Sequence, residues 1–187
     1  MEDRRTILKS GLALGLGLRS LDVLHAQAED PRKARPQEGD RFVFAFGPRQ
    51  GETIGVDDVP LASEQIICYA MDPASGTVRD GSRLNQVLLL RFDPESLSPE
   101  TREVSADGVV AYSGICPHTG CDIEDWSEET EFLICSCHES EFDPRDAAEV
   151  ISGPAPRRLP SLPLRSEGGV LVATGGFSAT IRFQKEF

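Results

Sequence analysis

Short apolar and alternating runs, separated by glycine, proline and aspartate, recur along the chain from about residue 40 onward. Runs of this kind, rich in valine, isoleucine, phenylalanine and tyrosine, predict β-strands. The dipeptides Asp80-Gly81 and Asp107-Gly108 predict tight turns, the second directly before a strand. No segment keeps a 3.6-residue hydrophobic period for long, so long helices are not expected. The expected strands are residues 41–46, 65–69, 86–92, 109–112, 132–135, 170–174 and 180–183.

This pattern predicts an all-β fold, either a sandwich or a small barrel, formed by residues 41–187. The stretch from about 113 to 158 differs, because it is rich in cysteine, histidine, glycine, proline and acidic residues and poor in strand signals. We expect it to be a loop-rich subdomain inserted between strands of the larger β body. Residues 29–40 are polar and contain two prolines, which is typical of a linker.

The first 28 residues have the organisation of an export signal. Arg4 and Arg5 form a twin-arginine pair, residues 11–18 are a short apolar stretch containing glycine, and residues 26–28 supply a small-x-small cleavage pattern. The segment resembles a signal of the twin-arginine (Tat) pathway, which exports proteins already folded around a cofactor. It predicts a periplasmic protein. The alternative is an uncleaved amphipathic anchor, and membrane association is expected only in that case.

The overall composition excludes some classes of function. The chain has 187 residues and a net charge of −12, and no apolar run reaches the roughly 18 residues that a membrane-spanning helix needs. A general nucleic-acid-binding role is excluded, because phosphate contacts need a basic face. Four of the five cysteines fall between Cys116 and Cys137, whereas Cys68 lies in a predicted strand and is expected to be a buried core thiol.

Two short motifs in this cysteine-rich window carry metal-ligating side chains. They are Cys116-Pro-His118-Thr-Gly-Cys121 and Cys135-Ser-Cys137-His138-Glu-Ser140. Two cysteines and two histidines hold either one zinc ion or the two irons of a [2Fe–2S] centre. Zinc sites usually place like ligands together, whereas each motif here contributes one of each kind, which favours the iron–sulfur centre. A structural zinc or binding module is the alternative.

The two motifs resemble the signature of Rieske iron–sulfur proteins, C-x-H-x-G-C followed by C-x-C-H-x-S. The resemblance implies that Cys116 and Cys135 bind the buried iron through sulfur, and that His118 and His138 bind the exposed iron through nitrogen. It implies one [2Fe–2S] cluster per chain and electron transfer as the function, with no substrate chemistry on this chain. Rieske oxygenases are not expected, because the chain has no room for a catalytic mononuclear-iron domain.

The resemblance also assigns the other two cysteines of the window. In high-potential members of the family, the residues matching Cys121 and Cys137 form a disulfide that ties the two loops together. An oxidising, exported setting is compatible with such a bond. Residues 153–156 resemble the proline loop that covers the cluster from a third side. Export by the twin-arginine pathway agrees with this picture, because the cluster is built in the cytoplasm and the protein must leave folded.

Two positions depart from the quinol-oxidising, cytochrome bc-type members of the family. The residue after the first ligand histidine is commonly apolar and is Thr119 here, and the residue after the second is commonly glycine and is Glu139 here. A polar, acidic tip is a poor match for an apolar quinol pocket. These departures predict the small subunit of a periplasmic oxidoreductase, resembling that of arsenite oxidase. The alternative is the Rieske subunit of a quinol:cytochrome c reductase of the bc1 type.

Acidic residues dominate the cysteine-rich window and bear on its partners. Residues 113–149 contain eleven acidic side chains and a single basic one, Arg145. Opposite charge steers redox partners, so a basic c-type cytochrome is the expected acceptor, with Glu139 and Glu141 beside His138 in a docking role. The expected donor is a larger redox subunit, for which a molybdopterin-containing protein is a candidate.

Ser140 and Phe142 are expected to tune the redox potential of the cluster. Ser140 matches a family serine whose hydroxyl donates to a cluster sulfur, whereas Phe142 stands where bc-type proteins carry a tyrosine that donates to a ligand sulfur. Hydrogen bonds to sulfur stabilise the electron-rich reduced state, so the loss of one lowers the potential. Acidic neighbours lower it further, and a potential below that of bc-type Rieske centres follows.

We expect Phe142→Tyr to raise the redox potential, because the new hydroxyl restores a donor to a ligand sulfur. Redox titration of the wild-type protein and the variant measures the difference. An unchanged or lower potential in the variant would contradict the hydrogen-bond explanation.

Overall fold

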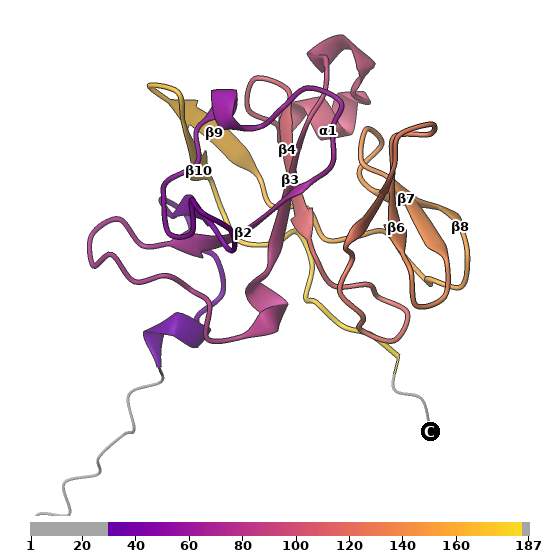
Figure 1. Ribbon diagram of the computed structural model, residues 1–187, viewed down its shortest axis with the longest axis horizontal. Coiled ribbons are helices and arrows are strands. Elements are labelled where there is room, and N and C mark those ends of the chain that lie inside the picture. The colour runs from indigo at the N-terminus through magenta and orange to yellow at the C-terminus, as the bar shows by residue number, and fades with distance from the viewer. Residues whose placement is uncertain (1–29, 185–187) are drawn as a thin grey trace, which may run out of the picture.

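The computed structural model describes residues 30–184, and the predicted export signal, residues 1–28, lies outside them. The described chain is mostly β, as predicted, and its strands form two sheets (Figure 1). The large sheet contains β1 (Arg41–Phe44), β2 (Ile66–Met71), β3 (Val87–Arg91), β4 (Val109–Ser113), β9 (Leu164–Glu167) and β10 (Val170–Ala173). The small sheet contains β5 (Asp125–Ser127), β6 (Phe132–Cys135), β7 (Ser140–Asp143) and β8 (Glu149–Ser152).

The large sheet curls toward a barrel. Its strand order is β4-β3-β2-β1-β10-β9, and neighbouring strands are antiparallel. The segment that leads into β9 returns to β4 at the other edge, where the Leu162 N–H donates to the Ala111 carbonyl at 2.9 Å. The Ser113 N–H likewise donates to the Pro160 carbonyl at 2.9 Å. These bonds cover backbone groups that an open sheet edge would leave unpaired.

Strands β3 and β4 separate two hydrophobic cores. Val87 and Leu89 of β3 belong to the first core, which fills the curled large sheet, whereas Leu88 and Leu90 belong to the second. This division follows from the two-residue period of a strand. The second core also contains Leu133 of β6, so it joins the two sheets. Burial on both faces explains why β3 is a continuous apolar run in the sequence.

The cysteine-rich window contains more strand than its sequence indicates. Besides the predicted strand at 132–135, which is β6, the window contains β5, β7 and β8, and the four strands form an antiparallel sheet in that order. Strand β7 has the sequence Ser-Glu-Phe-Asp, in which only alternate residues are buried, and such short, polar runs give a weak local signal. The strand predicted at 180–183 is wrong, since those residues join no sheet.

The helices of the described chain are short. The α-helix α1 (Pro99–Glu103) has Pro99 at its first position and is capped by Ser98. The Ser98 Oγ accepts a hydrogen bond from the Thr101 N–H at 3.4 Å. Single 3₁₀ turns form η1 (Pro31–Lys33), η2 (Val56–Asp58), η3 (Arg83–Asn85) and η4 (Pro94–Ser96). Within residues 30–184, no helix has the length and apolar character needed to cross a bilayer.

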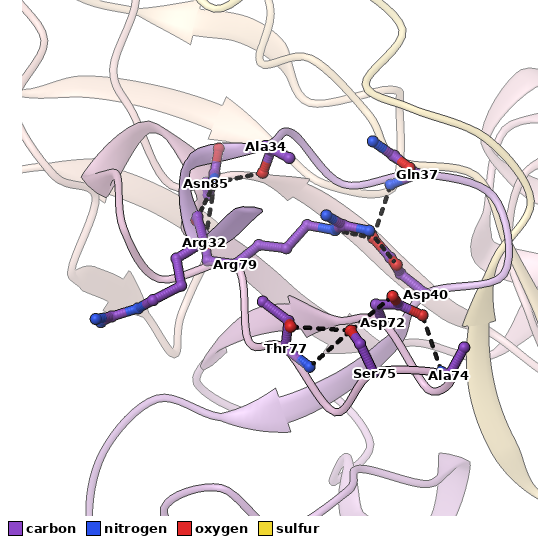
Figure 2. Close-up of polar contacts among 10 residues, drawn as sticks. All are labelled: Arg32, Ala34, Gln37, Asp40, Asp72, Ala74, Ser75, Thr77, Arg79 and Asn85. Carbon is purple, nitrogen blue, oxygen red and sulfur yellow. Dashed lines mark hydrogen bonds and ion pairs between the residues drawn. The ribbon is translucent and has the colours of Figure 1, made fainter. Parts of the chain in front are cut away.

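Residues 30–40, expected to be a linker, pack against the large sheet (Figure 2). Buried Asp40 accepts hydrogen bonds from Arg79 Nε at 2.6 Å and from Arg79 Nη2 at 2.9 Å. The buried Asn85 side chain donates to the Ala34 and Arg79 carbonyls, each at 2.8 Å. These contacts fasten the start of β1 to the turn that follows β2, so this segment is part of the folded body.

Asp40→Asn is expected to lower the free energy of unfolding by about 3 kcal/mol, because it leaves the buried Arg79 guanidinium without its counter-charge. Chemical denaturation measures the change. Glu167→Gln is the control, since the Arg165–Glu167 pair at 2.7 Å is exposed and its loss should cost less than about 1 kcal/mol. Equally small effects of both substitutions would show that the buried pair contributes no more than the exposed one.

Candidate metal centre

The first motif loop, residues 116–121, follows β4 and is closed by its own backbone. The Cys116 N–H donates to the Cys121 carbonyl at 2.8 Å, and the Gly120 N–H donates to the Cys116 carbonyl at 3.0 Å. Gly120 has a φ of +85°, which glycine adopts without strain. The loop buries Cys116 in the second core, with 1% of the residue exposed, and leaves His118 half-exposed.

The second motif loop, residues 135–140, is the hairpin between β6 and β7. Cys135 and Ser140 lie opposite each other in this strand pair, and the Glu139 N–H donates to the Cys135 carbonyl at 2.9 Å. Residues 136–139 protrude from the sheet and are exposed, His138 among them. Cys135 and Ser140 are buried. Each motif loop therefore buries one cysteine, Cys116 or Cys135, and leaves its histidine more exposed.

The proline loop, residues 153–156, packs against the second motif loop. The Ala155 N–H donates to Ser140 Oγ at 3.1 Å. Gly153 has a φ of +85°, and a Cβ there would lie 2.5 Å from the Ser140 Cα, so this contact requires glycine. Ala155 belongs to the same core as Cys116 and Cys135. The proline loop therefore contacts the second motif loop at the core that holds both buried cysteines.

The two histidines converge although they lie on different loops. Nδ1 of His118 is 3.2 Å from Nδ1 of His138, and the ring planes are 89° apart with centroids at 4.6 Å. Two nitrogens that bind one tetrahedral metal ion through bonds of about 2.0–2.1 Å lie roughly 3.3 Å apart. The spacing of the two Nδ1 atoms therefore suits a pair of ligands to one metal ion.

The two free cysteines of the site form a buried pair. The pKa of the Cys116 thiol is raised to about 11, mainly by burial and in part by the neighbouring Cys135. Hydrogen bonds from the His118 backbone N–H and the Ser140 side chain act in the opposite direction. A thiol with a raised pKa is deprotonated when a bound cation offsets the cost of burying its charge. The pair therefore suits a positively charged iron centre.

Cys121 and Cys137 form a disulfide that joins the tips of the two motif loops. The resemblance to Rieske proteins implied this pairing. The Sγ atoms of Cys121, Cys135 and Cys137 lie within 4.8 Å of one another, but disulfide sulfurs are not thiolates and do not supply metal-binding charge. This leaves Cys116 and Cys135 as the available sulfur donors.

The two predicted tuning residues are both fully buried beside the cysteines. Ser140 lies opposite Cys135, and Phe142 lies opposite Leu133 in the same pair of strands. Phe142 belongs to the second core together with Cys116 and Cys135. Its ring therefore lies in the core that also holds the two sulfur donors.

Three further residues hold the first motif loop, and sequence reasoning did not identify them. Arg83 in η3 donates to the Gly120 carbonyl and forms an ion pair with Asp122 at 2.8 Å. The Gln184 N–H donates to the His118 carbonyl at 2.7 Å, and the Phe183 ring lies against Gly120. No local sequence signal marks these residues, because each lies far along the chain from the loop it contacts.

The fold and the site define a class of protein. They combine a curled β-sheet with a small sheet whose loops present two buried thiols and two exposed imidazoles, a donor set that suits a mixed iron–sulfur centre. The profile of the Rieske [2Fe-2S] domain matches residues 65–163, more than half of the chain. The chain belongs to this family. It binds one [2Fe–2S] cluster and functions in electron transfer.

Curated relatives match part of this chain over part of their own length. The cytochrome bc1 complex Rieske iron-sulfur subunit of Streptomyces lividans is 39% identical over 97 residues, which are 51% of this chain and 57% of the relative. That of Mycobacterium bovis is 32% identical over 217 aligned positions, covering 93% of this chain and 51% of the relative. A putative respiratory nitrate reductase subunit Rieske from Haloferax mediterranei is 39% identical, covering 55% of this chain and 47% of the relative.

The similarity thus spans about half the length of these curated relatives. Among solved structures, the soluble domain of the Rieske protein II (soxF) from Sulfolobus acidocaldarius is 24% identical. The match has a TM-score of 0.39 and covers 54% of this chain and 68% of that one.

Cys116→Ser and Cys135→Ser are each expected to abolish cluster binding, because serine does not replace a thiolate as a ligand to iron. Iron and acid-labile sulfide content of the anaerobically purified proteins measures the loss. Cys68→Ser is the matched control, since Cys68 is also a free, buried cysteine but belongs to the first core. Full cluster content in Cys116→Ser or Cys135→Ser would contradict the ligand assignment.

Proposed function

We propose that this chain is the electron-transfer subunit of a periplasmic oxidoreductase similar to arsenite oxidase. In this proposal, Cys116 and Cys135 hold the inner iron and His118 and His138 hold the outer iron. The bound cluster supplies one-electron redox chemistry. The chain receives electrons from a larger redox subunit, with a molybdopterin-containing protein as the candidate, and passes them to a c-type cytochrome.

The observation that carries this proposal is the polar tip of the second motif loop, which consists of residues 138 and 139. His138 and Glu139 are both exposed, and Glu139 has a φ of +56°. Left-handed backbone at a residue other than glycine costs about 1–3 kcal/mol, and such residues cluster at functional sites. Five other non-glycine residues of the described chain also have a positive φ, so it is the exposed charge of Glu139 beside His138 that supports a docking role. A charged tip fits a polar docking surface better than an apolar quinol pocket.

Charge around the tip supports a basic partner. Arg145 is the single base among residues 113–149, and it is already paired with Asp143 at 3.1 Å and with Glu131 at 2.9 Å. It therefore does not neutralise Glu139. A surface with an excess of acidic side chains increases the rate of encounter with a basic partner.

The compartment is proposed from two features. The disulfide between Cys121 and Cys137 suits an oxidising compartment. The pair Arg4 and Arg5 resembles a twin-arginine signal, and a pathway for folded proteins allows the cluster to be inserted before export. Both features agree with a periplasmic location.

The second candidate is the Rieske subunit of a quinol:cytochrome c reductase. The names of the Streptomyces lividans and Mycobacterium bovis relatives favour it, since both are cytochrome bc1 complex subunits. The nitrate reductase name of the Haloferax mediterranei relative shows that the same domain also occurs in other respiratory subunits. The two candidates differ in the partner to which the chain binds: a larger molybdopterin-containing subunit in the first and a cytochrome b in the second.

Purification of the full chain with its bound partners from its own cells separates the two candidates. The proposal expects a larger, molybdenum-containing subunit, and a co-purifying cytochrome b would overturn it in favour of the second candidate. Cell fractionation tests the compartment, because replacement of Arg4 and Arg5 by lysine should retain the protein in the cytoplasm. Continued export of that variant would contradict twin-arginine transport.

Glu139→Gln is expected to slow reduction of a basic c-type cytochrome roughly twofold to fivefold at low salt, because one docking charge is lost. Glu139→Gly should slow it equally while raising the free energy of unfolding by up to about 1 kcal/mol, since the backbone strain is relieved. Stopped-flow kinetics across ionic strengths and chemical denaturation measure these effects. A wild-type rate that does not fall as salt rises would contradict electrostatic docking.

A further inference from the structure

A short arm, residues 181–184, lies against the first motif loop. In Figure 1 the yellow segment runs past the large sheet and ends beside the loops next to β6 and β7. The Gln184 N–H donates to the His118 carbonyl at 2.7 Å. This hydrogen bond is made to the backbone of the very residue whose imidazole faces His138.

The arm makes a second contact at Gly120, where the absence of a side chain leaves room for the Phe183 ring. A Cβ at Gly120 would lie 2.8 Å from Cγ of Phe183, so the Phe183 ring is stacked directly on the glycine backbone. The Gly120 carbonyl accepts a hydrogen bond from Arg83 of the large-sheet body. The first motif loop is therefore held at His118 and Gly120 by groups outside itself.

The arm is also tied to the loops on the other side of the site. Arg157, which follows the proline loop, donates to the Arg182 carbonyl. Ile181 is buried, so the arm is anchored at its base as well as along its length. The arm thus links the first motif loop to the segment that follows the proline loop.

We propose that residues 181–184 are a positioning strap that fixes the His118 imidazole. The strap holds the His118 carbonyl and covers Gly120, so the histidine ring keeps its orientation toward Nδ1 of His138 while its edge stays exposed. Gln184 and Phe183 are positioning residues, because they act through the backbone of the loop and do not touch the expected metal. The proposal rests on the assignment of His118 as a ligand and is independent of the identity of the redox partners.

The hydrogen bond from Gln184 can be removed without changing the loop itself. Gln184→Pro deletes the backbone donor, whereas Gln184→Ala retains it and is the matched control. In the full-length, cluster-loaded protein, hydrogen–deuterium exchange of the peptide over residues 113–122 reports opening of the loop. Gln184→Pro should accelerate it about fivefold, the effect of losing one net hydrogen bond, and Gln184→Ala should leave it unchanged.

The electron paramagnetic resonance spectrum of the reduced cluster reports the geometry of its ligands. It should change in Gln184→Pro and not in Gln184→Ala. Phe183→Ala should change both readouts in the same direction, whereas Phe46→Ala, which removes an exposed phenylalanine in the loop after β1, should change neither.

Unchanged exchange in Gln184→Pro, equal acceleration in Gln184→Ala, or faster exchange with an unaltered spectrum would each overturn the strap. These outcomes would leave the proposed function intact, because that function is tested separately by cluster content and by the partners that co-purify.

Discussion

Burial of the Cys116 and Cys135 thiols, combined with the half-exposed His118 and the exposed His138, is the constraint on which the site depends. Burial raises the pKa of Cys116, so the thiolate form requires a cation close by. The imidazoles must reach the same centre from the outside, and they do so with their Nδ1 atoms 3.2 Å apart. Two short closed loops meet both requirements, because each buries its cysteine and exposes its histidine.

The rigidity of these loops comes from the cores below them. The second core joins the two sheets through β3, β4, β6 and β7, and it contains both free cysteines of the site. The disulfide between Cys121 and Cys137 then fixes the outer ends of the two motif loops relative to each other. A redox centre benefits from such a frame, because ligands held on packed elements keep their geometry in both charge states.

Two segments that pack on the folded body lie outside the region that matches the family. The match covers residues 65–163, whereas the buried Asp40 and the arm at residues 181–184 lie outside it. Both outlying segments pack on the body, the first through Arg79 and the second through His118. Within the matched region, the second motif loop carries the charged residue Glu139 at a left-handed backbone position.

The sequence by itself determined the β class, the two motifs and the family, because ligand spacing and strand alternation are local patterns. It located β3 and β4 closely, since their apolar runs reflect burial on both faces. Only the tertiary structure decided three features: the small sheet around β7, the packing of residues 30–40, and the hydrogen bond from Gln184 to His118. The packing of residues 30–40 and the Gln184 contact depend on segments distant in the chain. The strands of the small sheet pair with their neighbours in the chain, but β5 and β7 are short and polar, so their local pattern is weak.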